Sequence, residues 1–427
     1  MAHYLLAATP LRGHLMPMLV IGSGLQSLGH DVTVLTGADL ADAVRDAGLD
    51  MVALPDRVRI DPPAAAPMLL RKLPAPLRRF WLGRAELRSV FVEPLAAQAH
   101  ALRAMLDHTA VDAILADVTF TGALAVLLGT APRPPIVACG VAPLTLSSVD
   151  TPPFGMAWQP QEGVDYSRMT SVAHRVIMRD SQHAFDTALR RAGVGGGAPV
   201  FISDWPRLAD AMVQLSVAGF EYPRSDLPET VEFVGPALPP ADTAFEKPSW
   251  WSDLQSARTV VLVTQGTFDN TDLDQLITPT LRGLADLDDV LVVATTGGRA
   301  GQRLPTRIPA NARVTDWVPY SALMPHVDVM ITNGGYGGVQ YALSHGVPLV
   351  VAGETSDKAE VAARVAYTGV GVDLKTTTPT PQAVRAAVLR LRDDDRHRDA
   401  AQRLCAEIGR ATTIDAIANA LKRCSDA

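Results

Sequence analysis

Residues 4–36, YLLAATPLRGHLMPMLVIGSGLQSLGHDVTVLT, contain the clearest indication of the fold. Residues 4–8 form a short apolar run that is typical of a buried strand. Pro17 stands where a first helical position tolerates a missing N–H, and apolar residues then recur at helical spacing until Gly29 ends the helix. Residues 32–36 are rich in β-branched side chains and predict a second strand. A strand, a helix and a strand in succession predict a parallel sheet with a right-handed crossover.

The same succession returns along the rest of the chain. Residues 111–116 and 135–138 predict strands on either side of an apolar helix over residues 120–128. Four further apolar runs predict buried strands, and they cover residues 259–263, 290–294, 327–331 and 349–351. The sequence therefore predicts an α/β protein with two similar halves, in which ligands bind in the crevice at the carboxyl ends of the strands.

A stretch rich in proline and acidic residues separates the two halves. It predicts an amino-terminal domain over residues 1–222, a linker over residues 223–256 and a second domain over residues 257–410. The last stretch, residues 411–427, contains a helix candidate, and packing back on the first domain is among its alternatives.

Composition and charge exclude several classes of protein. Of the 427 residues, 48% are hydrophobic and only 19% are charged, a balance that excludes intrinsic disorder. The net charge of −7 argues against binding to nucleic acid, because nucleic-acid-binding proteins normally carry a basic domain. The three cysteines are far apart and form no CxxC pair, so neither a disulfide framework nor a zinc site is expected.

The sequence also indicates where the protein is located. The N-terminus lacks the pattern of a secretory signal, and no apolar run is long enough to span a bilayer. We therefore expect a cytoplasmic protein, as a monomer or a homodimer. Residues 71–88, RKLPAPLRRFWLGRAELR, carry six cations against the single Glu86, which fits either a contact with anionic lipid or a solvated helix face. We favour the solvated face.

Two residues in the first half predict acid–base chemistry. His14 follows the first predicted strand, in the segment TPLRGHLMP, next to the start of the helix. The positive end of a helix dipole lowers the pKa of an imidazole, and a neutral imidazole is a competent general base. Asp117 ends the strand in VDAILADVTF, where it fits either the N-cap of the next helix or an acceptor for the second ring nitrogen of His14. For His14 the alternative is a hydrogen bond to the backbone.

Two loops of small residues in the second half predict an anion site. Thr264-Gln265-Gly266-Thr267 follows one predicted strand, and TNGGYGG, residues 332–338, follows another and opens a helix. Glycines let backbone amides approach a diphosphate, and the helix N-terminus supplies a partial positive charge. Neither loop matches a P-loop or a GxGxxG fingerprint. The alternative for the glycine-rich loop is a simple tight turn.

Together these motifs resemble the GT-B glycosyltransferases, and within them the family of plant secondary-metabolite and bacterial macrolide or antibiotic glycosyltransferases. The segment PLRGHLMP is similar to the family's Pro-x-x-Gly-His-x-x-Pro loop, which implies that His14 is the acceptor base. The segment ADVTF is similar to the family's aspartate segment, which implies that Asp117 supports the histidine. The implied fold is two doubly wound Rossmann-like domains that face each other across a cleft, the first binding the acceptor and the second the nucleotide sugar.

The resemblance also assigns binding residues. LTLSSVDTPPFG, residues 144–155, is similar to an acceptor-side loop of the bacterial members, and the acceptor-binding residues implied there are Leu144, Pro153, Phe154 and Met156. The donor signature consists of WVPY at 317–320, His326, TNGGYGG, GVP at 346–348 and Asp357-Lys358, in that order. It implies that Trp317 stacks on the nucleotide base, that Thr267 and residues 333–338 hold the diphosphate, and that Asp357 holds the sugar. The full donor-binding set implied is Thr264, Gly266, Thr267, Trp317, Val318, Asn333, Gly334, Gly335, Gly337, Gly338, Tyr341, Asp357 and Lys358.

Three positions depart from the family pattern. Asn333 stands where the family usually has a histidine, Tyr341 where it has the ribose-binding glutamate, and Lys358 where it has a glutamine. An amide at position 333 still donates to a phosphate oxygen but carries no charge. The departures bear on the recognition of the ribose and of the donor sugar, and the nucleotide is left open between UDP and dTDP.

The activity implied is inverting, metal-independent transfer of a sugar from a UDP- or dTDP-linked donor to a hydroxyl group of an apolar small molecule, such as a macrolide, a polyketide or a phenol. No cofactor is expected besides this co-substrate, and no Asp-x-Asp metal motif stands in a suitable loop. Two alternatives keep the fold: a non-catalytic nucleotide-sugar-binding auxiliary protein and a sugar-nucleotide epimerase. We favour the transferase because His14 and Asp117 are both present.

Overall fold

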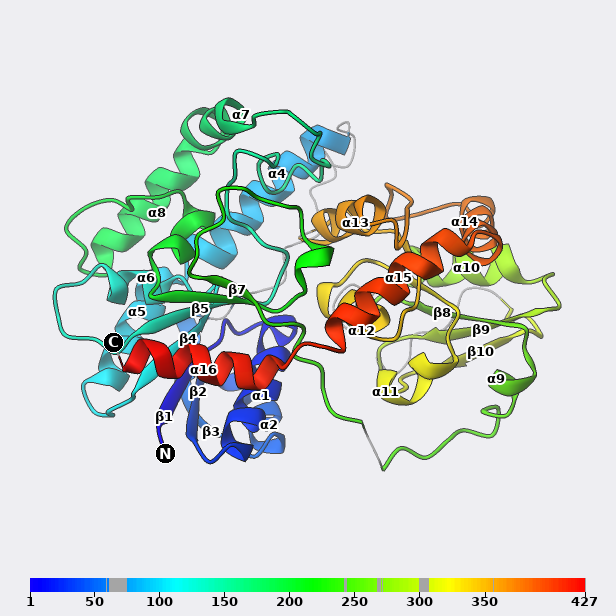
Figure 1. Ribbon diagram of the computed structural model, residues 1–427, viewed down its shortest axis with the longest axis horizontal. Coiled ribbons are helices and arrows are strands. Elements are labelled where there is room, and N and C mark those ends of the chain that lie inside the picture. The colour runs from blue at the N-terminus through cyan, green and yellow to red at the C-terminus, as the bar shows by residue number, and fades with distance from the viewer. Residues whose placement is uncertain are drawn as a thin grey trace.

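Two parallel β-sheets form the centres of two halves that lie side by side (Figure 1). The structure is a computed structural model, and it describes residues 1–58, 60, 75–241, 244–266, 270, 272–298, 307–355 and 357–426. The predicted α/β class with two doubly wound domains is confirmed.

The first half contains a sheet of seven strands in the order β3-β2-β1-β4-β5-β6-β7. The strands are β1 (His3–Ala7), β2 (Asp31–Gly37), β3 (Asp50–Leu54), β4 (Ala113–Asp117), β5 (Ile136–Gly140), β6 (Ala211–Gln214) and β7 (Val231–Phe233). All neighbouring strands are parallel. The strand order reverses between β1 and β4, and ligands of doubly wound sheets bind at such a switch point. Asp117 ends β4, and His14 lies in the helix directly after β1.

The second half repeats this plan with six strands in the order β10-β9-β8-β11-β12-β13. They are β8 (Thr259–Thr264), β9 (Val290–Thr295), β10 (Ala312–Thr315), β11 (Val329–Thr332), β12 (Leu349–Val351) and β13 (Gly371–Asp373), all parallel to their neighbours. The switch point here lies between β8 and β11. The two loops of small residues follow these two strands, so the topology brings them together.

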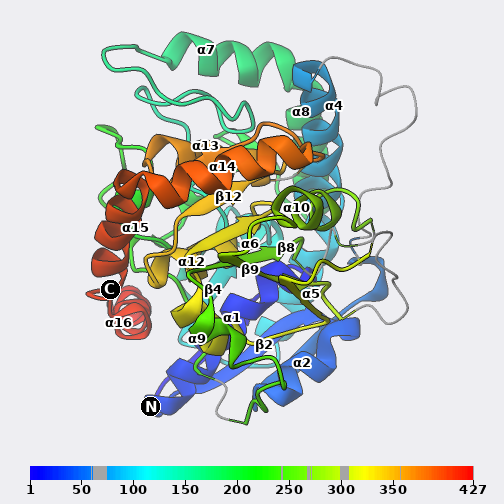
Figure 2. The same ribbon diagram turned by 90° about the vertical axis from the view of Figure 1, so that its right-hand side faces the viewer.

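Helices pack on both faces of each sheet (Figure 2). Those of the first half are α1 (Arg12–Ser27), α2 (Ala41–Asp46), α4 (Ala75–Leu87), α5 (Leu95–Leu106), α6 (Gly122–Leu127), α7 (Ser167–Val172) and α8 (Arg179–Arg191). Those that follow are α9 (Asp253–Ser256), α10 (Ile277–Leu284), α11 (Tyr320–Leu323), α12 (Tyr336–Ser344), α13 (Lys358–Tyr367), α14 (Pro381–Asp393), α15 (Asp395–Ile408) and α16 (Thr413–Ser425). None of the helices within the described ranges is long and apolar enough to cross a membrane.

The apolar runs form the central strands because both faces of each sheet are covered. Every residue of β4, β5, β8 and β9 is buried. Along β8, Val260 and Leu262 pack into one hydrophobic cluster, whereas Val261 and Val263 pack into the cluster on the opposite face. Successive side chains of a strand point to opposite faces, so a continuous apolar run is what such a strand requires.

Helix α1 begins at Arg12, five residues before the predicted start at Pro17. Pro17 therefore lies inside the helix, where its missing N–H removes one backbone hydrogen bond. The first turn holds without that bond, because the N–H groups of His14 and Leu15 both donate to the Leu11 carbonyl at 2.9 Å. His14 thus lies on the first turn of a helix and not in a loop.

The first sheet extends into the predicted linker. Strand β7 lies within residues 223–256, and Val213 of β6 pairs with Glu232 of β7. At the other end of this range, Trp251 and Leu254 are buried in a core cluster of the second half. The linker boundaries predicted from proline content are therefore too wide, because proline density does not exclude a short edge strand.

Helix α16 crosses from the second half to the first and packs there (Figure 1). Its Ile417 and Leu421 are fully buried in a core cluster of the first half. Ser425 Oγ donates to the Asp112 carbonyl at 3.1 Å, and Arg423 forms an ion pair with Glu232 of β7. The C-terminal helix therefore ties the two halves together a second time.

The basic tract is partly described. Residues 71–74 lie outside the described residues, and the rest of the tract forms α4 and the residue after it. Arg84 Nη2 donates to Asp180 Oδ2 of α8 at 2.6 Å, while Trp81 is 48% exposed. One cation of the tract is thus held by an ion pair within the protein.

Candidate active site

His14 and Asp117 meet at the switch point of the first sheet, although 103 residues separate them in the sequence. His14 Nδ1 lies 3.0 Å from Asp117 Oδ2 and 3.2 Å from Oδ1. The Asp117 side chain is fully buried, whereas 21% of the His14 side chain remains exposed. Asp117 is not the N-cap of the next helix, since α6 begins at Gly122 with Thr121 as its N-cap. The geometry is that of a partly exposed imidazole held by a buried carboxylate.

Neighbouring donors saturate the Asp117 carboxylate. Thr119 donates to it twice, from Oγ1 to Oδ2 at 2.8 Å and from its backbone N–H to Oδ1 at 3.0 Å. The backbone N–H of Thr9 donates to Oδ2 at 3.3 Å. Burial raises the pKa of Asp117, but the charge and hydrogen bond of His14 and the two bonds from Thr119 outweigh it and lower the pKa below its ordinary value. Asp117 is therefore an ionised, acceptor-only group.

The pKa of His14 is raised. Burial lowers it, but the charge of Asp117 and the hydrogen bond to Asp117 outweigh burial. The expectation that the helix dipole lowers this pKa is wrong in direction, because the adjacent full charge exceeds the partial charge of a helix end. Since an ionised carboxylate only accepts, the proton lies on Nδ1, and Nε2 is the nitrogen available to a substrate proton.

Charge from the second half also reaches His14. The carboxylate of Asp357, one residue before α13, raises the pKa of His14 in addition to Asp117, and Glu86 of α4 does the same. Such an effect falls off with distance, so the predicted sugar-binding residue and the predicted base lie close enough to interact electrostatically.

The two loops at the second switch point are tied to each other. Thr264 is the last residue of β8, and Gly266 follows it with a φ of +69°, a conformation that favours glycine. Asn333, directly after β11, donates from Nδ2 to the Gln265 carbonyl at 2.6 Å. Asn333 therefore links the loops where the family pattern has a histidine. Thr267 lies outside the described residues.

The glycines of the glycine-rich loop differ in how much room surrounds them. Gly334 has a φ of +88°, and a Cβ there would lie 2.8 Å from Val351 Cγ1. Gly335 is the N-cap of α12, and Gly338 lies within that helix against Met330. A Cβ at Gly337 would meet nothing within 4 Å. The start of α12 is thus an open helix N-terminus, which is a general site for anions.

The remaining donor-side residues lie in three different environments. Trp317, after β10, is 58% exposed, whereas the adjacent Val318 is buried in the core of the second half. Tyr341 is also buried, with its ring stacked on His345 and in edge contact with Tyr320. Trp317 therefore has a face to offer to a ligand, and Tyr341 is part of an aromatic cluster on α12.

Asp357 and Lys358 lie beside the glycine-rich loop. Lys358 begins α13, and its backbone carbonyl would lie 3.3 Å from a Cβ at Gly334. Its Nζ donates to Thr355 Oγ1 at 3.3 Å. The structure thus brings the predicted sugar-binding pair next to the predicted phosphate loop.

The predicted acceptor residues divide between core and surface. Leu144 is 1% exposed and packs in the core of the first half. Pro153 is buried, Met156 is partly buried and Phe154 is 37% exposed. Phe154 and Met156 are therefore the members of this set whose side chains keep surface for a ligand.

Several residues of the site were not identified from the sequence. Thr119 is signalled weakly, since a hydroxyl two residues after an aspartate often bonds to it. Thr9 and Glu221 have no local signal, because their partners lie far away in the chain. Glu360 and Arg364 stand at the spacing of a helical ion pair, but nothing local indicates their partners in the first half. Within the described residues, no group of three or more His, Cys, Asp or Glu side chains is placed to hold a metal ion.

The chain is similar over its whole length to proteins of known class. Residues 278–423 match the family described as Erythromycin biosynthesis protein CIII-like, C-terminal domain. The 4'-demethylrebeccamycin synthase of Lentzea aerocolonigenes is 37% identical over 430 residues, which cover 97% of this chain and 98% of that protein. UDP-glycosyltransferase 2 of Phaeomoniella chlamydospora is 33% identical over 98% of this chain and 94% of its own. Among solved structures, the kitacinnamycin glycotransferase has a TM-score of 0.75 at 23% identity and covers 99% of this chain and 98% of its own.

Proposed function

Because the chain belongs to the family of GT-B glycosyltransferases that includes 4'-demethylrebeccamycin synthase and UDP-glycosyltransferase 2, we propose that it transfers a sugar from a UDP- or dTDP-linked donor to a hydroxyl group of an apolar small molecule, with inversion and without a metal ion. The observation that carries the proposal is the contact between His14 and Asp117, 3.0 Å long at the switch point of the first sheet. A buried carboxylate that orients a partly exposed imidazole is an arrangement suited to general-base catalysis.

On the acceptor side, His14 Nε2 removes the proton from the acceptor hydroxyl as its oxygen attacks the anomeric carbon. Asp117 stabilises the imidazolium that forms, and its own donors keep it ionised throughout. Attack and departure of the diphosphate occur on opposite faces of one carbon, so the configuration inverts. A positioned base contributes about 10²–10⁴-fold to such a reaction. Phe154 and Met156 contact the acceptor.

On the donor side, the loop over residues 333–338 and the start of α12 hold the diphosphate. The leaving diphosphate gains negative charge, and preorganised amides at the helix N-terminus meet that charge as it develops. Trp317 stacks on the base, and Asp357 and Lys358 contact the sugar. We place UDP first as the nucleotide, because UDP-glycosyltransferase 2 is named for it, with dTDP as the alternative.

A donor-by-acceptor screen tests the proposal. The purified protein is incubated with UDP- and dTDP-sugars, with and without macrolide, polyketide and phenolic acceptors, and the products are identified by mass spectrometry. We expect a conjugate of acceptor and sugar, formed equally well in excess EDTA. The coupling constant of the product's anomeric proton then reports inversion.

The same screen separates the alternatives. A sugar nucleotide that changes without an acceptor identifies an epimerase. Binding of a nucleotide without any conversion identifies an auxiliary binding protein. Either result contradicts the proposed transfer.

A further inference from the structure

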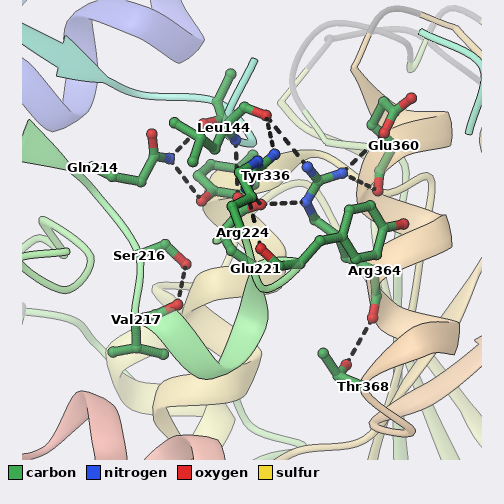
Figure 3. A network of polar contacts seen from close by, with 12 residues as sticks. Leu144, Gln214, Ser216, Val217, Glu221, Arg224, Tyr336, Glu360, Arg364 and Thr368 are labelled. Atoms are coloured by element: carbon green, nitrogen blue, oxygen red, sulfur yellow. Dashed lines mark hydrogen bonds and ion pairs between the residues drawn. The ribbon is translucent and has the colours of Figure 1, made fainter. Parts of the chain in front are cut away.

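A buried network of charged side chains joins the two halves (Figure 3). Arg364 of α13 is 1% exposed, and its guanidinium donates to two carboxylates at once. Its Nε bonds Glu221 Oε2 of the first half at 2.7 Å, and its Nη1 bonds Glu360 Oε2, on the same helix, at 2.9 Å. Both carboxylates are almost fully buried. The cation of the second half is therefore compensated in part by an anion of the first.

Each carboxylate uses its second oxygen to hold the acceptor-side loop, residues 144–155, or Ala157 just beyond it. Glu221 Oε1 accepts from the backbone N–H of Leu144 at 2.9 Å. Glu360 Oε1 accepts from the backbone N–H groups of Gly155 at 2.7 Å and Ala157 at 2.8 Å. One end of the acceptor-side loop is thus held by Glu221, and the other by a residue of the donor half.

Further contacts close the network. Arg224 Nη2 donates to the Leu144 carbonyl at 3.2 Å, and its Nη1 lies 3.9 Å from Glu221 Oε2. The pKa of Arg224 is lowered to about 10 by burial. The Tyr222 ring covers the Arg364 guanidinium at 4.5 Å from the ring centroid. Two arginines and two glutamates therefore balance one another's charge between the two halves. Burial of such a network requires this pairing.

The conformation of the loop depends on these contacts. Gly155 has a φ of +95°, and Ala157, which has a Cβ, has a φ of +55°. The left-handed region is unfavourable for alanine, so surrounding contacts must hold it there. The two amides bonded to Glu360 are those of these two residues, and Gln159 Nε2 adds a bond to the Ala363 carbonyl of α13 at 3.3 Å. The donor half thus shapes a loop of the acceptor half.

We propose that Glu360 is a positioning residue for sugar transfer, which holds the acceptor-side loop on α13 and thereby sets the acceptor relative to the donor sugar. The proposal rests on the proposed function. Glu360 lies one helical turn from Asp357, the predicted sugar contact, so a single rigid element carries the contact to the sugar and the anchor of the acceptor-side loop. Displacement of α13 therefore displaces both substrates together, and their binding is coupled.

The test removes the carboxylate in Glu360→Ala and uses Glu407→Ala as the matched control. Glu407 of α15 is also a carboxylate of the second half that accepts from a backbone N–H of the first half, that of Gly219 at 3.1 Å. It does not contact the acceptor-side loop, so it controls for the loss of one contact between the halves.

Two readouts are measured on both variants. The first is hydrogen–deuterium exchange of the peptide that covers Gly155 and Ala157; we expect exchange at least tenfold faster in Glu360→Ala and unchanged in Glu407→Ala. The second is a comparison of substrates, with UDP binding measured by calorimetry and transfer measured with the donor–acceptor pair that gives most conjugate in the screen. We expect the KM for that acceptor to rise about tenfold in Glu360→Ala, with a smaller change in kcat and UDP affinity within twofold.

Unchanged exchange in Glu360→Ala overturns the proposal. So does a fall in UDP affinity as large as the rise in the KM for the acceptor. Should Glu360→Ala fail to fold, the isosteric Glu360→Gln decides. An uncharged amide oxygen accepts more weakly than a carboxylate oxygen from the two loop N–H groups, so exchange at least threefold faster supports the proposal and wild-type exchange overturns it. Exchange does not require catalysis. A protein that transfers no sugar thus contradicts the proposed function, whereas unchanged exchange contradicts this inference even in a protein that transfers sugar.

Discussion

The switch points of the two sheets carry different kinds of site. In the first sheet, the central groups are side chains: an imidazole and a buried carboxylate, to which the Thr119 hydroxyl and two backbone N–H groups donate. In the second sheet, the site is built from backbone: positive φ at Gly266 and Gly334, and the open N-terminus of α12. Proton transfer needs a group whose pKa is tuned, whereas a diphosphate needs only oriented dipoles. This difference explains how a chain of net charge −7 is suited to an anionic donor.

Replacement of His14 separates the two sites most strongly. His14→Ala removes the base, and we expect transfer to fall about 10²–10⁴-fold, the usual contribution of a positioned base. Nucleotide affinity should stay within twofold, because the donor site is built on the other sheet. Transfer rates check the loss of catalysis, and UDP calorimetry checks the nucleotide affinity. Normal turnover would disprove the assignment of the base.

Asp117→Asn removes the negative charge at position 117 but keeps the shape of the side chain. We expect a loss of about a hundredfold in transfer, since the imidazolium loses its counter-charge. The pH profile changes as well. Asp117 raises the pKa of His14, whereas burial alone lowers it, so the variant's imidazole deprotonates at lower pH and the acid limb of kcat/KM moves to lower pH. An acid limb at the wild-type position would show that His14 is not the titrating group.

Gly334→Ala tests the site that is built from backbone. The substitution places a Cβ at a φ of +88° and 2.8 Å from Val351 Cγ1. We expect the free energy of unfolding to fall by about 1–3 kcal/mol, together with nucleotide affinity. Gly337→Ala is the control for stability, because a Cβ there meets nothing within 4 Å and alanine favours a helix by up to about 1 kcal/mol. Equal stability of the two variants in urea would contradict a conformational need at Gly334.

Trp317→Ala should produce the smallest effect. An exposed indole contributes little to the core, so the melting temperature should not change. Loss of stacking on a base costs about 1–3 kcal/mol, and we therefore expect nucleotide affinity to fall about tenfold. Acceptor KM should stay constant. Unchanged affinity for UDP and dTDP would remove Trp317 from the donor site.

Local patterns predicted the elements that are buried from end to end. The strands β4, β8 and β9 were predicted within two residues of their bounds. Strands that are covered on both faces consist of continuous apolar runs, which are easy to recognise. The predicted start of α1 was wrong, because Pro17, a residue typical of the first helical position, lies inside the helix. Strand β7 was missed, because the proline-rich composition around it predicted a linker. The direction of the His14 pKa was also wrong, because it depends on a carboxylate 103 residues away.

The two parallel sheets, the loops at their switch points and the residue types in those loops could be predicted from local patterns, since hydrophobic periodicity and the position of glycines are local properties of a chain. Three features follow from the folded structure alone: Asp117 is ionised against His14, the charge of Asp357 raises the pKa of the same histidine, and Glu360 of one half holds Gly155 and Ala157 of the other. Charges and hydrogen bonds depend on distance in space and on burial, and neither is written in the spacing of residues along the chain.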